Sequence, residues 1–143
     1  MTTSSKSKRL LDAYTFPGFR PLSKVRGVFG DPKARVITLV RRSKKLPVVH
    51  TGWYDRCTRR VRDLSCADTR VYLEIEVRRV HCRSCGKVKR ERLDFLADNP
   101  LYTKRFAFYV GRRCRSATVK DVARELHLDW HAVKELDKQY MAA

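Results

Sequence analysis

The hydrophobic pattern of this chain changes its period near residue 100, and that change constrains the fold more than any other feature. From Arg70 to Arg78, apolar and polar residues alternate strictly, which is the period of a half-buried strand. After Asn99-Pro100 the period becomes helical, along a stripe formed by Tyr102, Phe106, Tyr109, Val110 and Cys114. We therefore predict an α+β fold, in which a small antiparallel sheet precedes three helices.

Two further apolar runs predict neighbours for this strand. Val36–Val40 is a short β-branched run, and Val48–Tyr54 is a second candidate strand. The polar stretch Ser65–Thr69 can turn the chain between Val48–Tyr54 and the strand that begins at Arg70. We expect a zinc-finger-like β segment over residues 48–98, followed by a helical module over residues 99–143.

Local capping signals divide residues 99–143 into three helices. Thr118, with an acid three residues later at Asp121, is a variant of the capping box and predicts a helix start. Asp129 can cap a third helix after a break at Leu128. The predicted helices begin near Thr103, run from Thr118 to about His127, and run from Trp130 to about Met141.

The second and third helices match the helix-turn-helix template. Ala123 takes the small-residue position at which the two helices touch. His127 stands where the turn usually begins with Gly, and histidine can adopt the left-handed conformation at modest cost. The positions expected to be buried carry Val122, Leu126, Leu128, Val133 and Leu136, and Cys114 on the first helix is interpreted as a buried thiol.

This template predicts two kinds of contact with DNA. The polar side of the third helix could reach base edges in a major groove, and cations on and before the second helix could touch the phosphate backbone. Glu135 and Asp137 dilute the positive charge, so a plain helical hairpin with a solvated face is the alternative. The candidate DNA-binding residues are Arg112, Arg113, Arg115, Lys120 and Arg124, together with Trp130, His131, Lys134 and Lys138.

The charge of the chain favours a polyanionic partner, nucleic acid first. Lys and Arg number 33 against 15 Asp and Glu, which gives a net charge of +18. Residues 1–47 are predicted as a basic arm, loose and partly disordered, with one strand. This arm is either a solvated leader or a segment that contacts phosphates when it folds on DNA.

Five cysteines, an odd number, favour metal ligands or buried thiols over a disulfide framework. Cys82-Arg-Ser-Cys85 has the form of a zinc knuckle, in which two thiolates reach one tetrahedral ion. One knuckle supplies half of a closed site, so bound Zn²⁺ needs two more ligands. His50 and Cys57 are the preferred candidates, because His81 would point away from Cys82 on an alternating strand. A vestigial knuckle without metal, or a redox or intermolecular role, are the alternatives.

The sequence shows no catalytic arrangement: it has no Ser-His-Asp order, no Gly-rich phosphate loop and no His-Glu-x-x-His segment. Asp55, Asp63 and Asp68 are interpreted as turn residues or ion-pair partners of the surrounding arginines, which are Arg56, Arg59, Arg60, Arg62 and Arg70. No apolar run approaches the length of a membrane span, and the first residues lack a secretion signal. We expect a cytoplasmic protein without a membrane partner.

The order of these features resembles the N-terminal region of the ISL-three family of bacterial insertion-sequence transposases. The resemblance covers roughly Val36–Met141, and it implies that Cys82 and Cys85 match the family's second zinc knuckle. It also implies that Val119–Tyr140 match the helix-turn-helix that recognises transposon ends. The features that carry it are the Arg-Arg-Val-Arg-Asp-Leu stretch 59–64, the strand 71–77, the segment 78–85 with its knuckle, Tyr102-Thr-Lys-Arg-Phe106 and the helix-turn-helix.

The chain departs from that family in two places. The family's first Cys-x-x-Cys is replaced by Leu46-Pro-Val-Val-His50-Thr-Gly-Trp53, so the first knuckle is missing. The family continues into a ribonuclease-H-like domain whose acidic triad binds divalent metal and performs strand cleavage and transfer, whereas this sequence stops at Ala143. The resemblance therefore implies a truncated transposase, or its DNA-binding part, that is not itself an enzyme.

These observations together predict sequence-specific binding of double-stranded DNA at transposon terminal inverted repeats. The expected partners are DNA of the bacterial nucleoid and either a second copy of the chain or a full-length transposase. The alternative is a non-catalytic remnant or interaction module that dimerises with intact transposase and inhibits it.

Overall fold

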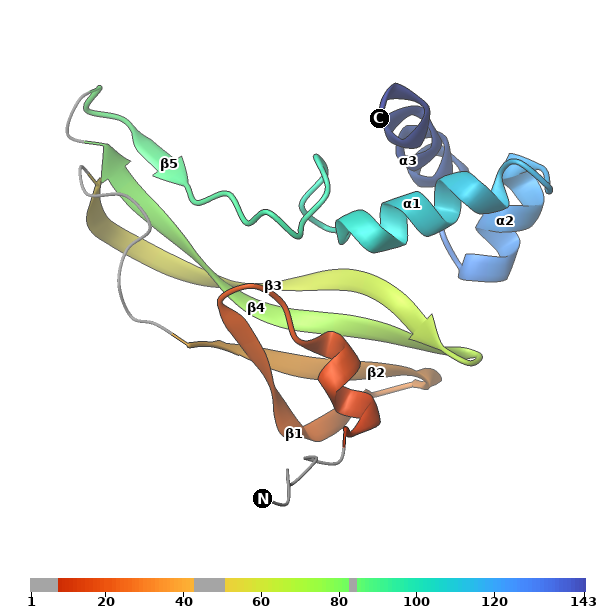
Figure 1. Ribbon diagram of the computed structural model, residues 1–143, viewed down its shortest axis with the longest axis horizontal. Helices are drawn as coiled ribbons and strands as arrows, with labels where there is room; N and C mark the ends of the chain where they lie inside the picture. Colours follow the sequence, from red (N-terminus) through yellow and green to blue (C-terminus); the bar gives the residue numbers. More distant parts are fainter. Residues whose placement is uncertain (1–7, 43–50, 83–84) are drawn as a thin grey trace, which may run out of the picture.

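The structure is a computed structural model that describes residues 8–42, 51–82 and 85–143. It is an α+β fold, as predicted, with a five-stranded sheet and helices gathered at one end of the molecule (Figure 1). None of the helices within these ranges has the length and apolar character needed to cross a membrane. The elements are η1 (Leu10–Tyr14), β1 (Phe19–Val28), β2 (Asp31–Arg41), β3 (Thr51–Cys66), β4 (Thr69–Cys82), β5 (Val88–Arg90), α1 (Lys104–Arg113), α2 (Val119–Leu126) and α3 (Trp130–Ala142).

The sheet has the strand order β1-β2-β4-β3, and β5 pairs with the end of β4. β3 and β4 form the predicted antiparallel hairpin, which closes through the turn after Cys66, where Ala67 has a φ of 54°. β2 and β4, however, are parallel, with Ala34 opposite Arg70. The prediction of a purely antiparallel sheet is therefore wrong. β4, the strand with the clearest apolar face, lies between β2 and β3, and it runs parallel to β2 and antiparallel to β3.

Residues 8–42 belong to the folded body, so the prediction of a loose arm with one strand is wrong for them. β1 and β2 form an antiparallel hairpin, and η1 precedes them. Tyr14, Phe16 and Phe19 are buried, and the ring of Phe16 stacks on that of Phe95 with 4.6 Å between centroids. These contacts join residues far apart in the sequence, which is why the local polarity of the segment conceals them. Residues 1–7 and 43–47, also predicted as part of the arm, lie outside the described residues.

Two hydrophobic clusters form the core. One lies on the inner face of the sheet, where Leu73 and Ile75 of β4 are fully buried beside the aromatic residues of the N-terminal segment. The other lies among the three helices, where Phe106, Val122 and Val133 are fully buried. The strand and helix periods found in the sequence thus mark two different cores.

A buried carboxylate joins the helices to the sheet. Asp63 of β3 is 0% exposed, and its Oδ1 accepts hydrogen bonds from Thr103 Oγ1 at 2.7 Å and from Arg105 Nε at 2.8 Å. Arg105 also donates to the carbonyl of Ala13 at 2.9 Å, and its guanidinium lies 4.7 Å from the centroid of the Phe16 ring. Three segments of the chain, namely the N-terminal segment, β3 and the start of α1, therefore meet at one ion pair.

Backbone hydrogen bonds reinforce this junction at the edge of the sheet. Arg62 N donates to the carbonyl of Leu101 at 2.8 Å, and Thr103 N donates to the carbonyl of Arg62 at 3.1 Å. The segment before α1 thus covers part of the edge of β3, where unpaired backbone groups would otherwise be exposed.

The three aspartates considered in the sequence all form ion pairs, as predicted, but their partners are not the surrounding arginines. Asp55 pairs with Arg79, Asp63 with Arg105, and Asp68 with Lys33. Strand pairing or helix docking brings each partner from elsewhere in the chain, so sequence proximity identifies the wrong cations.

Replacing Asp63 by Asn should destabilise the fold without changing the volume of the side chain. The variant leaves Arg105 without its carboxylate, and we expect a loss of about 2–3 kcal/mol in the free energy of unfolding, less than for a fully buried pair because Arg105 is partly exposed. Urea denaturation followed by circular dichroism measures this. Asp55→Asn, which breaks an exposed pair, is the matched control and should leave stability nearly unchanged; equal effects would show that the junction does not hold the helices.

Candidate nucleic-acid interface

α2 and α3 form a helix-turn-helix whose local signals act as the sequence predicts. Thr118 caps α2 by accepting a hydrogen bond from Asp121 N at 3.1 Å, and α2 ends at His127 in the left-handed region, with φ 53° and ψ 51°. Asp129 occupies the N-cap position of α3, but its side chain makes no capping hydrogen bond, so that detail of the prediction is wrong. The turn between the helices comprises His127, Leu128 and Asp129.

The predicted buried positions of the motif are confirmed. Val122 and Val133 are fully buried, and Leu128 packs against the same cluster while partly exposed. Ala123, at the small-residue position, is 7% exposed. Leu126 and Leu136 complete the apolar face, so the sequence template and the packing agree.

α1 supports the motif through a close approach to α3. A Cβ added at Gly111 would overlap the side chain of Tyr140, so only glycine fits at this crossing. The ring of Phe108 meets that of Tyr140 edge-on, with 5.7 Å between centroids. Cys114, at the end of α1, packs against the helical core, and burial raises the pKa of its thiol, in agreement with its interpretation as a structural residue.

The face of α3 that points away from the core carries most of the predicted base-reading residues. His131, Lys134 and Lys138 are exposed, and Trp130 at the start of the helix is 43% exposed. The ammonium of Lys134 lies 5.0 Å from the centroid of the Trp130 ring, so the two side chains cover one another at the surface. Lys138 lies 3.8 Å from the carboxylate of Glu135, an exposed pair that is weak in water.

The arginines around the start of α2 fall into two groups, those paired with carboxylates and those without an ion-pair partner among the described residues. Arg113 donates to Glu125 at 2.7 Å, and this hydrogen bond raises the pKa of its guanidinium. Arg115 forms an ion pair with Asp137 of α3. Both arginines therefore tie helices together inside the module, a role that the sequence pattern does not distinguish from DNA contact.

Three of the cations predicted to contact the DNA backbone have no ion-pair partner within the described part of the chain. They are Arg112 at the end of α1 and, on α2, Lys120 and Arg124, and all three are exposed. Unpaired cations on helices next to the polar face of α3 are the groups best able to meet phosphates. These three therefore remain as the candidates for contact with the DNA backbone.

The structure brings further cations to the motif that the sequence analysis missed. Lys33 of β2 and Arg70 of β4 line a cavity together with His127, the C-cap of α2. The parallel pairing of β2 with β4 places them there. No local signal could have identified them, because this pairing joins segments about 35 residues apart.

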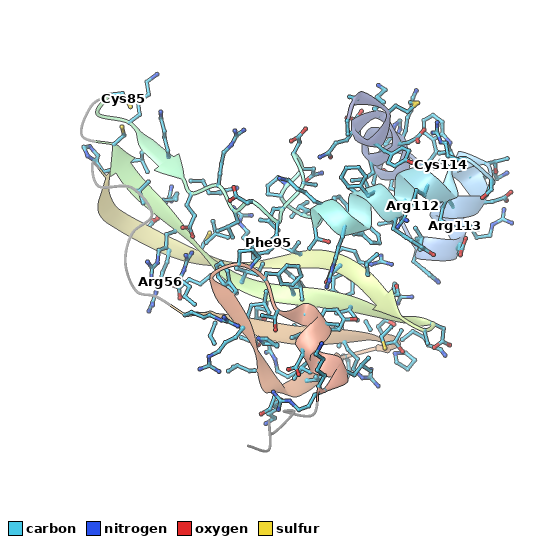
Figure 2. All side chains as sticks on the ribbon, in the orientation of Figure 1. Arg56, Cys85, Phe95, Arg112, Arg113 and Cys114 are labelled. Carbon is cyan, nitrogen blue, oxygen red and sulfur yellow. The ribbon has the colours of Figure 1, made fainter. Side chains whose placement is uncertain are left out.

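The zinc knuckle lies at the opposite end of the molecule from Arg112 and Arg113 (Figure 2). Its glycine behaves as the motif requires: Gly86 has a φ of 69°, and its N donates to the carbonyl of Cys82 at 2.8 Å. Cys57, however, pairs with Val77, five residues along β4 from Cys82 and therefore roughly 17 Å away. The proposal of Cys57 as a completing ligand is wrong.

The described residues do not complete a zinc site. Across residues 8–42, 51–82 and 85–143, no group of three or more His, Cys, Asp or Glu side chains lies close enough to hold a metal ion. His50, the other candidate, lies outside the described residues. Cys82 and Cys85 alone do not make the closed four-ligand shell of a structural zinc ion.

Comparisons with known proteins agree with this geometry. Residues 91–141 match the family model for the helix-turn-helix domain of transposase family ISL3. The chain is also 34% identical over 116 residues, 81% of its length, to the transposase for insertion sequence element IS1001 of Bordetella parapertussis, of which it spans 28%. No solved structure gives a significant match.

Residues 91–141 therefore match the helix-turn-helix domain of ISL3-family transposases, as the resemblance predicted, and the likeness to an insertion-sequence transposase agrees with this. The matched segment begins at Glu91, so it includes the whole helical module and does not include the knuckle at Cys82 and Cys85. The helix-turn-helix is supported by geometry and by comparison, and the zinc finger by neither.

Removing metal should leave the helical module intact. Its packing rests on Phe106, Val122 and Val133, none of which contacts the knuckle, so a chelator should not change the helical circular dichroism signal. We expect less than one zinc per chain by metal analysis of the purified protein. One tightly held zinc per chain, lost on His50→Ala, would contradict this and show that His50 completes the site.

Proposed function

We propose that this chain is the DNA-binding part of a transposase and that α3 reads base edges in the major groove of transposon ends. The observation that carries the proposal is the helix-turn-helix with an exposed polar face on α3, beside unpaired cations on α1 and α2. Trp130, His131 and Lys134 stand at the start of α3, the part of a recognition helix that usually enters the groove. The likeness to an insertion-sequence transposase supports the terminal inverted repeat as the target.

We assign binding rather than strand cleavage to this chain. The aspartates considered above as catalytic candidates, Asp55, Asp63 and Asp68, are each held in an ion pair with Arg or Lys. A carboxylate engaged in this way is a poor ligand for a divalent metal unless its cation leaves. Recombination chemistry would then belong to another domain of the transposase.

Binding to duplex DNA should depend strongly on salt and modestly on sequence. Each neutralised phosphate adds about 0.9 to the negative slope of log K against log salt, so roughly six to eight contacts would weaken binding by orders of magnitude between low and moderate salt. Fluorescence anisotropy with an ISL3-type terminal inverted repeat, and with a shuffled duplex as control, measures both properties. Absence of binding even at low salt would contradict the proposal and favour a module that dimerises with intact transposase.

Substitutions on α3 and on its supporting helices should have different effects. Lys134→Ala or His131→Ala should reduce discrimination at particular bases by about 1–3 kcal/mol, whereas Arg112→Ala should weaken all duplexes alike and flatten the salt slope by about one unit. Arg113→Ala should change the slope less, because Glu125 already neutralises that guanidinium. Titrations of each variant against matched and shuffled duplexes test this. Equal effects from Lys134 and Arg112 would mean that the orientation of α3 on DNA is wrong.

A further inference from the structure

A cavity of about 710 Å³ lies between the sheet and the helix-turn-helix. The β3–β4 turn borders it on one side, and the end of α2 with its C-cap His127 borders it on the other. Three cationic side chains line it: Lys33 of β2, Arg62 of β3 and Arg70 of β4. The cavity is therefore next to the turn that leads into α3.

Arg62 is the unusual member of this set. Its side chain is 4% exposed and lies between two aromatic rings, with its guanidinium 4.9 Å from the centroid of Phe106 and 5.7 Å from that of Tyr72. Its Nε and Nη2 are buried and have no hydrogen-bond acceptor among the described residues. Burial, together with the positive charge of Arg70, lowers the pKa of Arg62. A buried cation without a carboxylate partner is costly and rare.

The carboxylates near the cavity do not compensate this charge. Asp68 is paired with Lys33, Asp31 with Arg70, and Glu125 with Arg113. The last carbonyls of α2, which carry the negative end of the helix dipole, accept hydrogen bonds from the amides of the C-cap turn, among them Leu128 N to Ala123 O at 2.9 Å. Among the charged side chains that line this cavity in the described part of the chain, Arg62 is thus the one whose charge is not neutralised by an ion pair.

We propose that this cavity binds a phosphate group, supplied by the backbone of the DNA that α3 contacts. An anion there would offset the charge of Arg62. Lys33 at the rim could then leave Asp68 and meet the phosphate oxygens, because its pair with Asp68 is exposed and weak in water. The β1–β2 and β3–β4 hairpins would then clamp the DNA backbone beside the recognition helix. This inference rests on the proposed function for the source of the phosphate, and on the cavity alone for the anion site.

Arg62→Met is the main test, because stability and binding should respond differently. Methionine fills a similar volume between Tyr72 and Phe106, so the melting temperature should stay unchanged or rise when the unpaired charge is removed. Affinity for duplex DNA should fall about ten-fold, and the salt slope should flatten by about one unit. Lys33→Gln, at an exposed position, tests the same cavity without altering the core and should weaken binding in the same direction.

The matched control is Lys89→Gln on β5, at the other end of the sheet (Figure 1). It removes the same single charge and should leave affinity and slope unchanged. Titration of the full chain with inorganic phosphate, followed by amide NMR, tests the anion site directly. We expect saturable shifts at Arg70 and His127 in the unaltered chain and in Lys89→Gln, and none in Arg62→Met.

The two measurements separate this inference from the proposed function. Duplex binding that is the same in Arg62→Met, Lys33→Gln and Lys89→Gln, without saturable phosphate shifts, would overturn the cavity site and leave the proposed function standing. Saturable phosphate shifts in a chain that binds no duplex would support the anion site and overturn the proposed function. Saturable shifts with unchanged duplex binding in the two cavity variants would overturn the DNA backbone as the source and assign the site to a free phosphate.

Discussion

The position of the helix-turn-helix on the sheet depends on one buried carboxylate. Asp63 receives hydrogen bonds from Thr103, which caps α1, and from Arg105 in its first turn, so it determines where α1 begins and how it is anchored. α1 in turn positions α3 through the contact of Gly111 with Tyr140. A charge with no access to water must keep its partners, because the alternative is an unsolvated ion. The module therefore meets the sheet in one arrangement.

The net charge of +18 indicates a polyanionic partner but not where that partner binds. On the sheet, Arg26 and Arg60 both approach Glu74, and Arg56 approaches Glu76, so much of the basic character of the strands is neutralised locally. On the helices, Arg113 and Arg115 are likewise engaged with carboxylates. The pairing of charges, which only the fold decides, separates structural arginines from those free to meet phosphate.

The sequence predictions are correct where the interactions join residues close together in the chain, and they fail where the interactions join distant segments. The helix start near Thr103, the cap at Thr118 and the left-handed His127 are predicted correctly, because each depends on residues within one helical turn. The folded state of residues 8–42 was missed, because β1 and β2 are held by contacts with distant aromatic residues. Cys57 was misplaced for a related reason: strand register, and not spacing along the chain, sets its distance from Cys82.

By itself, the sequence determined the α+β class, the three helices and the helix-turn-helix, since hydrophobic periodicity and helix capping depend on residues that are close together in the chain. The tertiary structure decided the parallel pairing of β2 with β4, the partners of Asp63 and the burial of Arg62. These arise when segments far apart along the chain exclude water together, and no local pattern encodes which segments will meet. The arrangement of the helices beside the two hairpins is accordingly a product of packing, whereas the helix-turn-helix itself is a product of the local sequence.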